Sequence, residues 1–263
     1  MSTRAFAFID GASFETNIDP MLGELGTNFR EVDWRALTRN ADRVFYFDAL
    51  PVRKPNQTDE DFNQNLETKR ERLSFLRRQP NLHVREGLTR ARKNSGTPVL
   101  QQKGVDVALA VEVMMHAFQG TIDTARLFLN DLDFYPLLDL LTNTRVKSEL
   151  YYVASKTSEE MISAADISEE VNHNWLYPSL PEPVRSMCGP SGISEDYSHF
   201  SLRKLGRNRF GIVRLLSSQD GSRFVLEALS GPGSQFVHMG RSKEVLVQHL
   251  EASIREKVVW ENS

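Results

Sequence analysis

The feature of this sequence that most restricts its fold is an alternation of short strand-like runs with longer helical patterns. Runs rich in β-branched and aromatic residues stand at 5–10, 43–50, 82–86, 125–131 and 149–155. Helical periodicity fills 59–79, 105–119 and 133–144 between them, and a further helix is expected at 159–166, with Thr157 and Glu160 at capping-box spacing. Strands that alternate with helices favour βαβ units. We therefore expect an α/β domain with a mostly parallel sheet flanked by helices.

A change of composition near Tyr177 divides the chain. Residues 177–199 bring Pro, Gly and Ser together, as linkers do. Strand-like runs follow at 198–205, 209–218, 223–229 and 235–240, and then an amphipathic helix capped by Ser242. We expect a domain at 1–176, a linker at 177–199, and at 200–263 a small β-rich α+β C-terminal module that serves as an accessory of unknown function.

Composition excludes several classes of protein. A formal net charge of -3 over 263 residues rules out a strongly basic chain held to nucleic acid by bulk charge alone. The single cysteine, Cys188, excludes an internal disulfide and a Cys-rich zinc site, which favours a reducing, cytoplasmic location. No apolar run approaches the roughly 20 residues of a membrane span, and residues 1–11 lack the features of a signal peptide. We expect no membrane contact.

Acidic side chains gather where the expected strands end. Asp10 ends the first strand, and Asp131 and Asp133 end the fourth. In an open parallel sheet, ligands bind at the carboxyl edge where the strand order reverses, and in a doubly wound order strands one and four are neighbours there. Asp106, in the first turn of an apolar helix, falls near the same edge. Clustered carboxylates take up protons or hold a hard cation such as Mg²⁺ or Mn²⁺.

Each carboxylate also has a structural interpretation. Asp10 could form a turn with Gly11, Asp106 could favour a helix N-terminus, and Asp133 could be an N-cap. These roles do not explain why all of them fall on one edge. Glu112 is either an outer carboxylate of the site or a helix-surface residue, and Asp48, one strand away from the reversal, is expected to be structural or to support the site indirectly.

Three segments resemble a known family. FIDGASF (8–14), QKGVDVALAVE (102–112) and LNDLDFYPLL (129–138) are similar to the signature segments of the NYN domain, a branch of the PIN-like nucleases that includes LabA-type proteins. The resemblance extends over about residues 4–175. It implies a Rossmann-like, PIN-like fold and Mg²⁺- or Mn²⁺-dependent endonucleolytic cleavage of RNA by an activated water. It assigns metal and catalytic roles to Asp10, Asp106, Asp131 and Asp133.

The sequence departs from the family pattern at three places. Ser13 replaces the usual Asn, Leu129–Asn130 replaces Ser-Gly, and Glu112 replaces Asp. Ser13 is expected to hydrogen-bond a carboxylate or a water on the metal, and so to take part in substrate binding. The departures leave open an alternative, a catalytically weak or inactive NYN-type module that binds RNA or a protein. A phosphatase is a further alternative, but the DxDx[TV] motif is absent after Asp10.

Two basic segments are candidates for contact with RNA. Residues 87–104 are expected to form a loop leading into the helix of Asp106, where basic side chains could meet substrate phosphates; these are Arg90, Arg92, Lys93 and Lys103. A solvated charged surface is the competing interpretation. In the C-terminal module, Arg203, Lys204, Arg207, Arg209 and Arg214 could form a second RNA surface, a homo-oligomer or protein-partner interface, or an ordinary sheet face. Phe200, Phe210, Phe224 and Phe236 are expected in its core rather than in base stacking.

Overall fold

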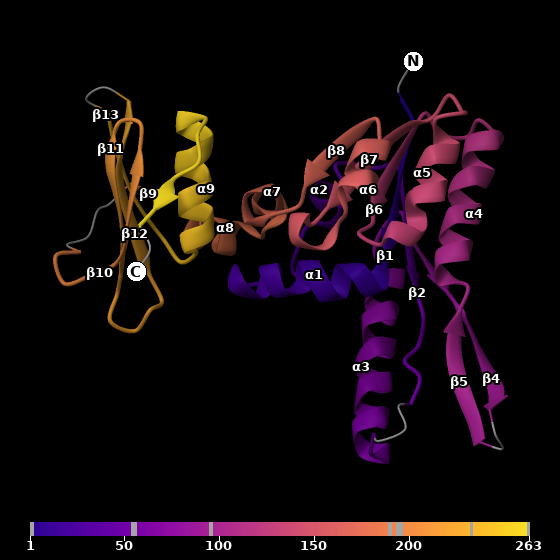
Figure 1. Ribbon diagram of the computed structural model, residues 1–263. Coiled ribbons are helices and arrows are strands. Elements are labelled where there is room, and N and C mark those ends of the chain that lie inside the picture. Colours follow the sequence, from indigo (N-terminus) through magenta and orange to yellow (C-terminus); the bar gives the residue numbers. More distant parts are fainter. Residues whose placement is uncertain are drawn as a thin grey trace. The chain divides into compact units, whose positions relative to one another are not determined.

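The computed structural model describes residues 3–53, 57–94, 97–188, 191–192, 197–231 and 234–261 (Figure 1). Within these ranges it describes every side chain except those of residues 88–94, 97–103, 174, 186–188, 191–192, 234–235 and 252–253. The chain forms two compact units, residues 1–19 with 34–171, and residues 20–33 with 172–263.

The first unit is built on a six-stranded parallel sheet of order β3-β2-β1-β6-β7-β8. Its strands are β1 (Ala5–Asp10), β2 (Arg43–Asp48), β3 (Leu82–Glu86), β6 (Thr124–Phe128), β7 (Lys147–Tyr152) and β8 (Ile167–Glu170). The prediction of a parallel α/β sheet, with the first and fourth expected strands adjacent, is confirmed. The strand order reverses between β1 and β6. The polar edge strand β8 was not expected, because its sequence ISEE lacks an apolar pattern.

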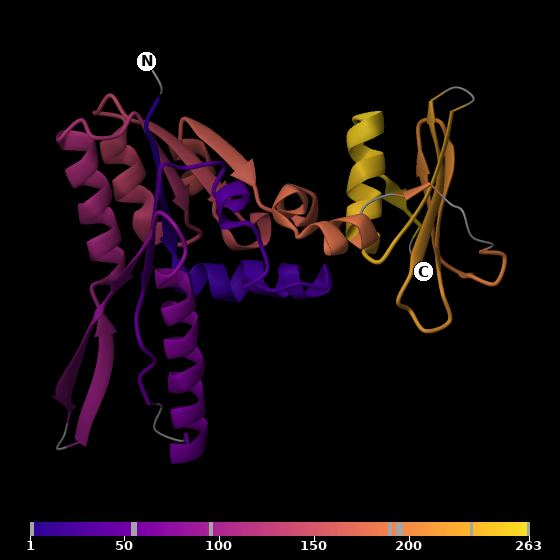
Figure 2. The same cartoon turned by 180° about the vertical axis from the view of Figure 1, so that it is seen from behind.

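Helices cover both faces of this sheet. They are α1 (Gly11–Glu24), α2 (Trp34–Leu37), α3 (Asp59–Arg77), α4 (Val105–Phe118), α5 (Tyr135–Leu141) and α6 (Glu159–Ala164). Helices α4 and α5 lie side by side on one face (Figures 1 and 2), where Phe8 of β1 packs with Leu109 and Leu138. On the other face, Phe14 of α1 stacks on Trp34, with ring centroids 5.4 Å apart. Both faces of the sheet are therefore covered by apolar layers, and the aspartates lie at its carboxyl edge.

Two helix starts differ from expectation. Helix α1, which contains Pro20, was not expected and follows β1 without a loop. Helix α6 is capped by Ser158, whose hydroxyl accepts a hydrogen bond from the Met161 N–H, so the prediction of a capping box at Thr157 is wrong. The Thr157 hydroxyl instead donates to Asn130 Oδ1 at 2.8 Å.

Gly11 makes the direct passage from β1 to α1 sterically feasible. A Cβ placed on Gly11 would lie 2.8 Å from the Phe47 carbonyl oxygen and 2.7 Å from Asp48 Oδ2. Real Cβ atoms do not come so close to backbone atoms, so only glycine fits. The Asp10–Gly11 pair is therefore a strand-to-helix junction rather than a simple turn, and it aims the Asp10 side chain at the carboxyl edge.

Helix α4, which was expected to be apolar, has two apolar sides. One side packs in the core through Leu109 and Val113, but another exposes apolar side chains at helical spacing. Phe118 is 78% exposed and Val107 is 66% exposed, with Val111 and Met115 between them. The helix is thus apolar on a buried face and on a solvent-exposed face.

The segment 87–104 is a hairpin, not the loop that its composition suggested. Strands β4 (Leu88–Asn94) and β5 (Thr97–Lys103) pair in antiparallel register as a separate two-stranded sheet. Pairing of this kind satisfies backbone groups without an apolar sequence pattern, which explains the error. The side chains of Arg90, Arg92, Lys93 and Lys103 lie outside the described side chains. The backbone does lead from Lys103 to the start of α4 at Val105, as expected.

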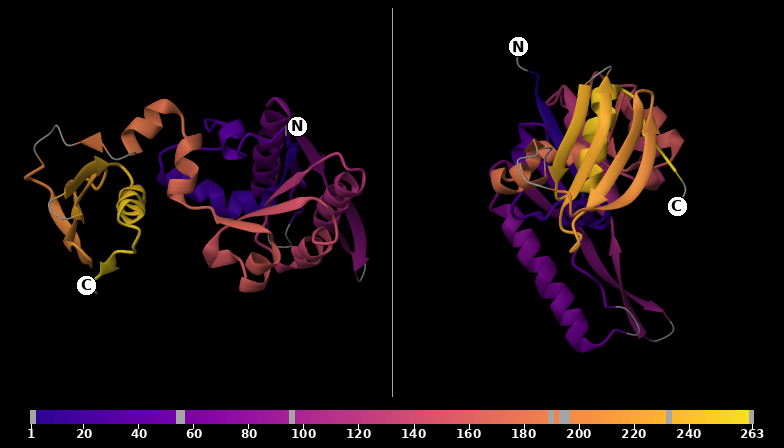
Figure 3. Two further views of the ribbon diagram at one scale, coloured as in Figure 1. Left: turned by 90° about the horizontal axis from the view of Figure 1, so that it is seen from above. Right: turned by 90° about the vertical axis from the view of Figure 1, so that its left-hand side faces the viewer.

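The second unit contains an antiparallel sheet of order β14-β10-β11-β12-β13-β9. Its strands are β9 (Ser191–Gly192), β10 (Ser201–Asn208), β11 (Gly211–Ser217), β12 (Phe224–Gly231), β13 (Ser234–Gly240) and β14 (Val259–Trp260). Helix α9 (Lys243–Ile254) lies along one face (Figure 3) and is capped by Ser242, as predicted. The expectation for the phenylalanines is confirmed, because Phe200 and Phe236 are buried and Phe210 and Phe224 pack against the core.

Short helices precede this sheet. They are α7 (His173–Leu176), a 3-10 turn at Tyr177–Ser179, and α8 (Glu182–Cys188). The stretch 177–199, which resembles a linker in composition, therefore contains ordered turns, and the domain boundary near residue 177 stays a prediction. Across the described ranges, no helix combines the length and the apolar character that crossing a bilayer requires.

Candidate metal centre

Four aspartates lie around the point where the strand order reverses. Asp10 is the last residue of β1 and is 8% exposed. Asp131 and Asp133 lie in the turn after β6, and Asp106 lies in the first turn of α4. Burial is the main cause of the raised pKa of both Asp10 and Asp106, and neighbouring carboxylates add to it: those of Asp106 and Asp131 for Asp10, and those of Asp131 and Asp133 for Asp106. All four carboxylates are therefore within electrostatic range of at least one other.

Asp10 is the least solvated member of this group. Its burial is the main reason why its pKa rises to about 6; the Ser13 N–H opposes the rise and the Asp106 carboxylate adds to it. The Ala12 N–H donates to Asp10 Oδ1 at 3.1 Å. Backbone N–H groups thus orient this carboxylate but replace only part of the water that it loses on burial. A bound cation would offset the remaining free-energy cost of burying the negative charge.

Asp131, not Asp133, has the capping role that the sequence suggested for its neighbour. Asp131 Oδ1 accepts from the Asp133 N–H at 3.0 Å and caps the 3-10 turn Leu132–Phe134. Helix α5 begins after Phe134 without a side-chain cap. The interpretation of Asp133 as an N-cap is wrong, and both side chains are solvent-exposed.

An open pocket of about 530 Å³ lies beside Asp10 and Asp131. Ser13, the expected substrate-binding serine, lines it together with Asn130, Asn17, Lys156 and Ser158. Lys156 was missed in the sequence, although it follows β7 at the same edge where Asp131 follows β6. The topological argument that selected the aspartates would have found this lysine if it had been extended to basic residues.

Two of the three departures from the family pattern, Ser13 and Asn130, contact each other. Asn130 Nδ2 donates to Ser13 Oγ at 2.5 Å, and Asn130 Oδ1 accepts from the Val153 N–H at 2.7 Å. The small residue at position 13 therefore makes room for the larger one at position 130. The Asn130 amide therefore lines the same pocket as Asp10, and it comes from the turn that follows strand β6.

We expect Asn130→Ala to lower the free energy of unfolding by about 2 kcal/mol, because it removes three hydrogen bonds and leaves the Val153 N–H without its acceptor. Urea unfolding of the purified protein measures this. Asn143→Ala is the matched control, since the exposed Asn143 makes one long contact of 3.5 Å to the Asp139 carbonyl. Equal effects of the two substitutions would show that Asn130 does not tie these loops together.

Two other acidic residues have structural partners. Both carboxylate oxygens of Glu112 accept from Arg85 of β3, at 2.6 and 2.7 Å. This assigns Glu112 to an ion pair rather than to the aspartate group. Asp48 lies 2.6 Å from Lys69 Nζ, in agreement with a structural role.

The aspartate group fits a hard, hydrated cation. Among the described residues, its oxygens do not come together as three ligands within 4.8 Å. Mg²⁺ keeps several waters and uses only one or two carboxylates directly, so Asp10 and Asp131, which line one pocket, are enough for the inner contacts. An oxygen-only donor set of this kind suits Mg²⁺ or Mn²⁺ better than zinc.

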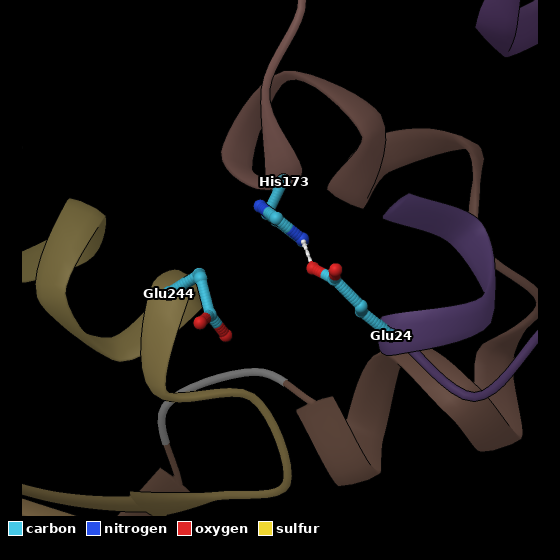
Figure 4. A group of neighbouring side chains, drawn as sticks. All are labelled: Glu24, His173 and Glu244. Atoms are coloured by element: carbon cyan, nitrogen blue, oxygen red, sulfur yellow. Dashed lines mark hydrogen bonds and ion pairs between the residues drawn. The ribbon is translucent and has the colours of Figure 1, made fainter. Parts of the chain in front are cut away.

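A second group of possible metal ligands lies in the other unit. Glu24, His173 and Glu244 each place one ligand atom within 4.8 Å of the others (Figure 4). His173 Nε2 is 2.7 Å from Glu24 Oε2, which is also an ordinary ion-pair contact. The three residues could hold a divalent ion. They are far apart in the sequence, and no sequence motif indicates that they come together.

The fold and the acidic edge define a Rossmann-like, PIN-like α/β domain. A family model described as "NYN domain" matches residues 4–171, so the chain belongs to the NYN domain family, a group within the PIN-like nuclease superfamily. NYN domains bind RNA, and NYN nucleases generally depend on divalent metals. No curated protein matches the chain.

Solved structures offer only distant similarity. A protein of unknown function from Vibrio parahaemolyticus has 16% identity and a TM-score of 0.42, with 65% of this chain and 94% of that chain covered. MurG from Acinetobacter baumannii has 12% identity and a TM-score of 0.29, with 64% and 41% covered. With TM-scores this low, neither supports an argument about function.

Proposed function

We propose that this protein is a Mg²⁺- or Mn²⁺-dependent endoribonuclease of the cytoplasm, as membership of the NYN family and the single cysteine together favour. The observation that supports it most is the convergence of Asp10, Asp106, Asp131 and Asp133 at the reversal between β1 and β6. Ligands of open α/β sheets bind at this place.

Each residue has a defined part in this proposal. Asp10 and Asp131 would hold the ion, while Asp106 and Asp133 would orient waters around it. A bound divalent ion supplies positive charge that lowers the pKa of water and offsets the charge of a phosphodiester under in-line attack. The Ser13 hydroxyl accepts hydrogen bonds from Asn130 and Asn17 and would itself donate a hydrogen bond to an oxygen atom in the pocket. No side chain need be covalently modified.

The test is cleavage of end-labelled single-stranded RNA with Mn²⁺, Mg²⁺ or EDTA, by wild type and by the double variant Asp10→Asn/Asp131→Asn. Metal-dependent cleavage that the variant lacks would support the proposal. RNA binding without cleavage under either metal would favour the alternative of a binding module, which the replaced residues at positions 13 and 130 suggest. Cleavage of a generic phosphate ester in preference to RNA would indicate a phosphatase.

Lys156 should draw RNA phosphate towards the aspartates, because it lines their pocket and is exposed. We expect Lys156→Gln to raise KM about tenfold with a smaller change in kcat, and to reduce the salt slope of RNA binding by about 0.7, the value for one lost contact to a single strand. Lys147→Gln is the control, because Lys147 begins the strand β7 that Lys156 follows and so lies at the opposite edge. An unchanged KM for Lys156→Gln would show that Lys156 does not contact the RNA substrate.

A further inference from the structure

The second unit contains a pocket that the NYN match, which ends at residue 171, does not include. Helix α9 lies along one face of the sheet (Figure 3), where it packs mainly on strands β12 and β13. The pocket lies between α9 and the strands β10, β11 and β14, and its volume is about 660 Å³. This is within the range of small-molecule sites, roughly 300–1,000 Å³. We call it the C-terminal pocket.

An aromatic side chain, Trp260, lines this pocket and packs against the core of the unit. Trp260 of β14 pairs with Gly206 of β10, and a Cβ on Gly206 would meet Trp260 Cε3 at 2.9 Å. The indole therefore lies directly against bare backbone. The Lys204 ammonium lies 5.5 Å from the centre of the ring. The indole is thus fixed on one side while it remains half-buried, which leaves part of its surface facing the pocket.

The charge of the pocket is positive. Four basic residues line it, Arg203, Lys204, Lys243 and Lys257, against the two acids Glu244 and Glu251. The acids are paired with Lys243 at 3.4 Å and with Lys257 at 3.0 Å. Arg203 donates from Nε to Ser217 Oγ at 2.6 Å, which orients its guanidinium. Over the described residues, neither Arg203 nor Lys204 has a carboxylate within 4.0 Å.

A flat ring surface beside two basic groups without acidic partners matches the chemistry of a nucleotide. Bases stack on aromatic side chains, and Arg and Lys form charge-assisted hydrogen bonds with phosphate. An acidic peptide would use the positive charge but not the indole. We infer that the C-terminal pocket binds a nucleotide unit, with the base on Trp260 and the phosphate at Arg203 and Lys204. The unit is part of an RNA strand or a free nucleotide. This inference does not depend on the cleavage reaction proposed above.

The test uses the full chain in EDTA, so that cleavage does not occur. Binding of a fluorescein-labelled single-stranded RNA of roughly ten nucleotides, a length typical of strand-binding modules, is measured by anisotropy over a range of salt. AMP and UMP are titrated separately while tryptophan fluorescence is followed. We expect Arg203→Gln/Lys204→Gln to weaken binding at least tenfold and to reduce the salt slope by about 1.4, the value for two lost contacts.

The matched control is Arg207→Gln/Arg214→Gln. Arg207 lies on β10 with the tested pair, and Arg214 lies on the adjacent β11; their side chains are 71% and 57% exposed and do not line the pocket. Trp260→Leu should weaken binding about tenfold and Trp260→Phe much less, because a phenyl ring still stacks. Thermal unfolding of every variant shows whether the fold is kept, and Trp260→Phe covers the case in which Trp260→Leu does not fold.

The outcomes separate the ligand sources. Binding of RNA alone would identify a strand site, and binding of AMP or UMP as well would identify a site for free nucleotides; both support the inference. Equal losses of RNA affinity in the two double variants would show that binding depends on general surface charge, and would overturn the inference. So would binding that Trp260→Leu, folded, leaves unchanged, or competition by poly-glutamate as strong as that by RNA.

Discussion

Asp10→Asn is expected to abolish RNA cleavage and, at the same time, to make the metal-free protein more stable. Losing a buried ligand to the ion removes several kcal/mol of transition-state stabilisation, which corresponds to a decrease in kcat of about a thousandfold. The same substitution removes an ionised carboxylate that is 8% exposed and is near other carboxylates. We expect the free energy of unfolding to rise by about 1–2 kcal/mol at pH 7.

The gain in stability should depend on pH in a defined direction. The pKa of Asp10 is about 6 in the folded chain against an ordinary value of 3.8, so the folded state binds the proton more tightly than the unfolded state. Wild-type stability therefore falls as pH rises through this interval, and stays lower above it. The advantage of the Asn variant is full at neutral pH and disappears as pH falls below the unfolded value. Urea unfolding at a series of pH values measures it.

The divalent ion supplies an independent check on Asp10. Mg²⁺ or Mn²⁺ in excess should raise the thermal midpoint of wild type, because binding to the folded state alone stabilises it, but should raise that of Asp10→Asn much less. Asp139→Asn, on the exposed side of α5, is the matched control and should change neither cleavage nor stability. A less stable Asp10→Asn variant that still cleaves RNA would identify Asp10 as a structural residue.

The fold could be predicted where strands are apolar and local periodicity is strong. Strand β1 begins and ends at the predicted residues, and the adjacency of β1 and β6 follows from the doubly wound order. Elements that gain their stability from pairing rather than from buried apolar side chains were missed. The edge strand β8 and the hairpin β4–β5 are both of this kind.

For the candidate site, topology indicated which carboxylates share an edge but not which groups support them. The contact between Ser13 and Asn130 joins residues that are 117 positions apart, and each looked like a loss of function by itself. Glu112 of α4 could not be assigned because its partner, Arg85, lies on strand β3, 27 positions earlier in the sequence. Partners of this kind depend on side-chain reach across the fold, which neither spacing nor periodicity specifies.

Lys69→Met should cause the largest loss of stability of any substitution proposed for this chain. Lys69 Nζ lies 2.6 Å from Asp48 Oδ2 and 2.7 Å from Glu15 Oε1, and the Asp48 side chain is only 4% exposed. Removing the cation leaves Asp48 buried without a counter-charge, and breaking such a pair from one side costs about 3–5 kcal/mol. The urea unfolding midpoint measures the loss. Lys147→Met, at an ion pair with Glu149 whose lysine is 48% exposed, should cost less than about 1 kcal/mol.

A second substitution tests the cause of that loss. Burial raises the pKa of Asp48 to about 6 even though Lys69 lowers it, so without Lys69 the pKa must rise further. The folded state of Lys69→Met then gains stability relative to the unfolded state as pH falls and Asp48 becomes protonated. The loss in free energy of unfolding relative to wild type should thus be largest at about pH 8 and become smaller towards about pH 5. Lys69→Met/Asp48→Asn should recover most of it at neutral pH, because no buried charge remains. A pH-independent deficit that the second substitution does not reduce would mean that Lys69 acts through packing of its aliphatic chain.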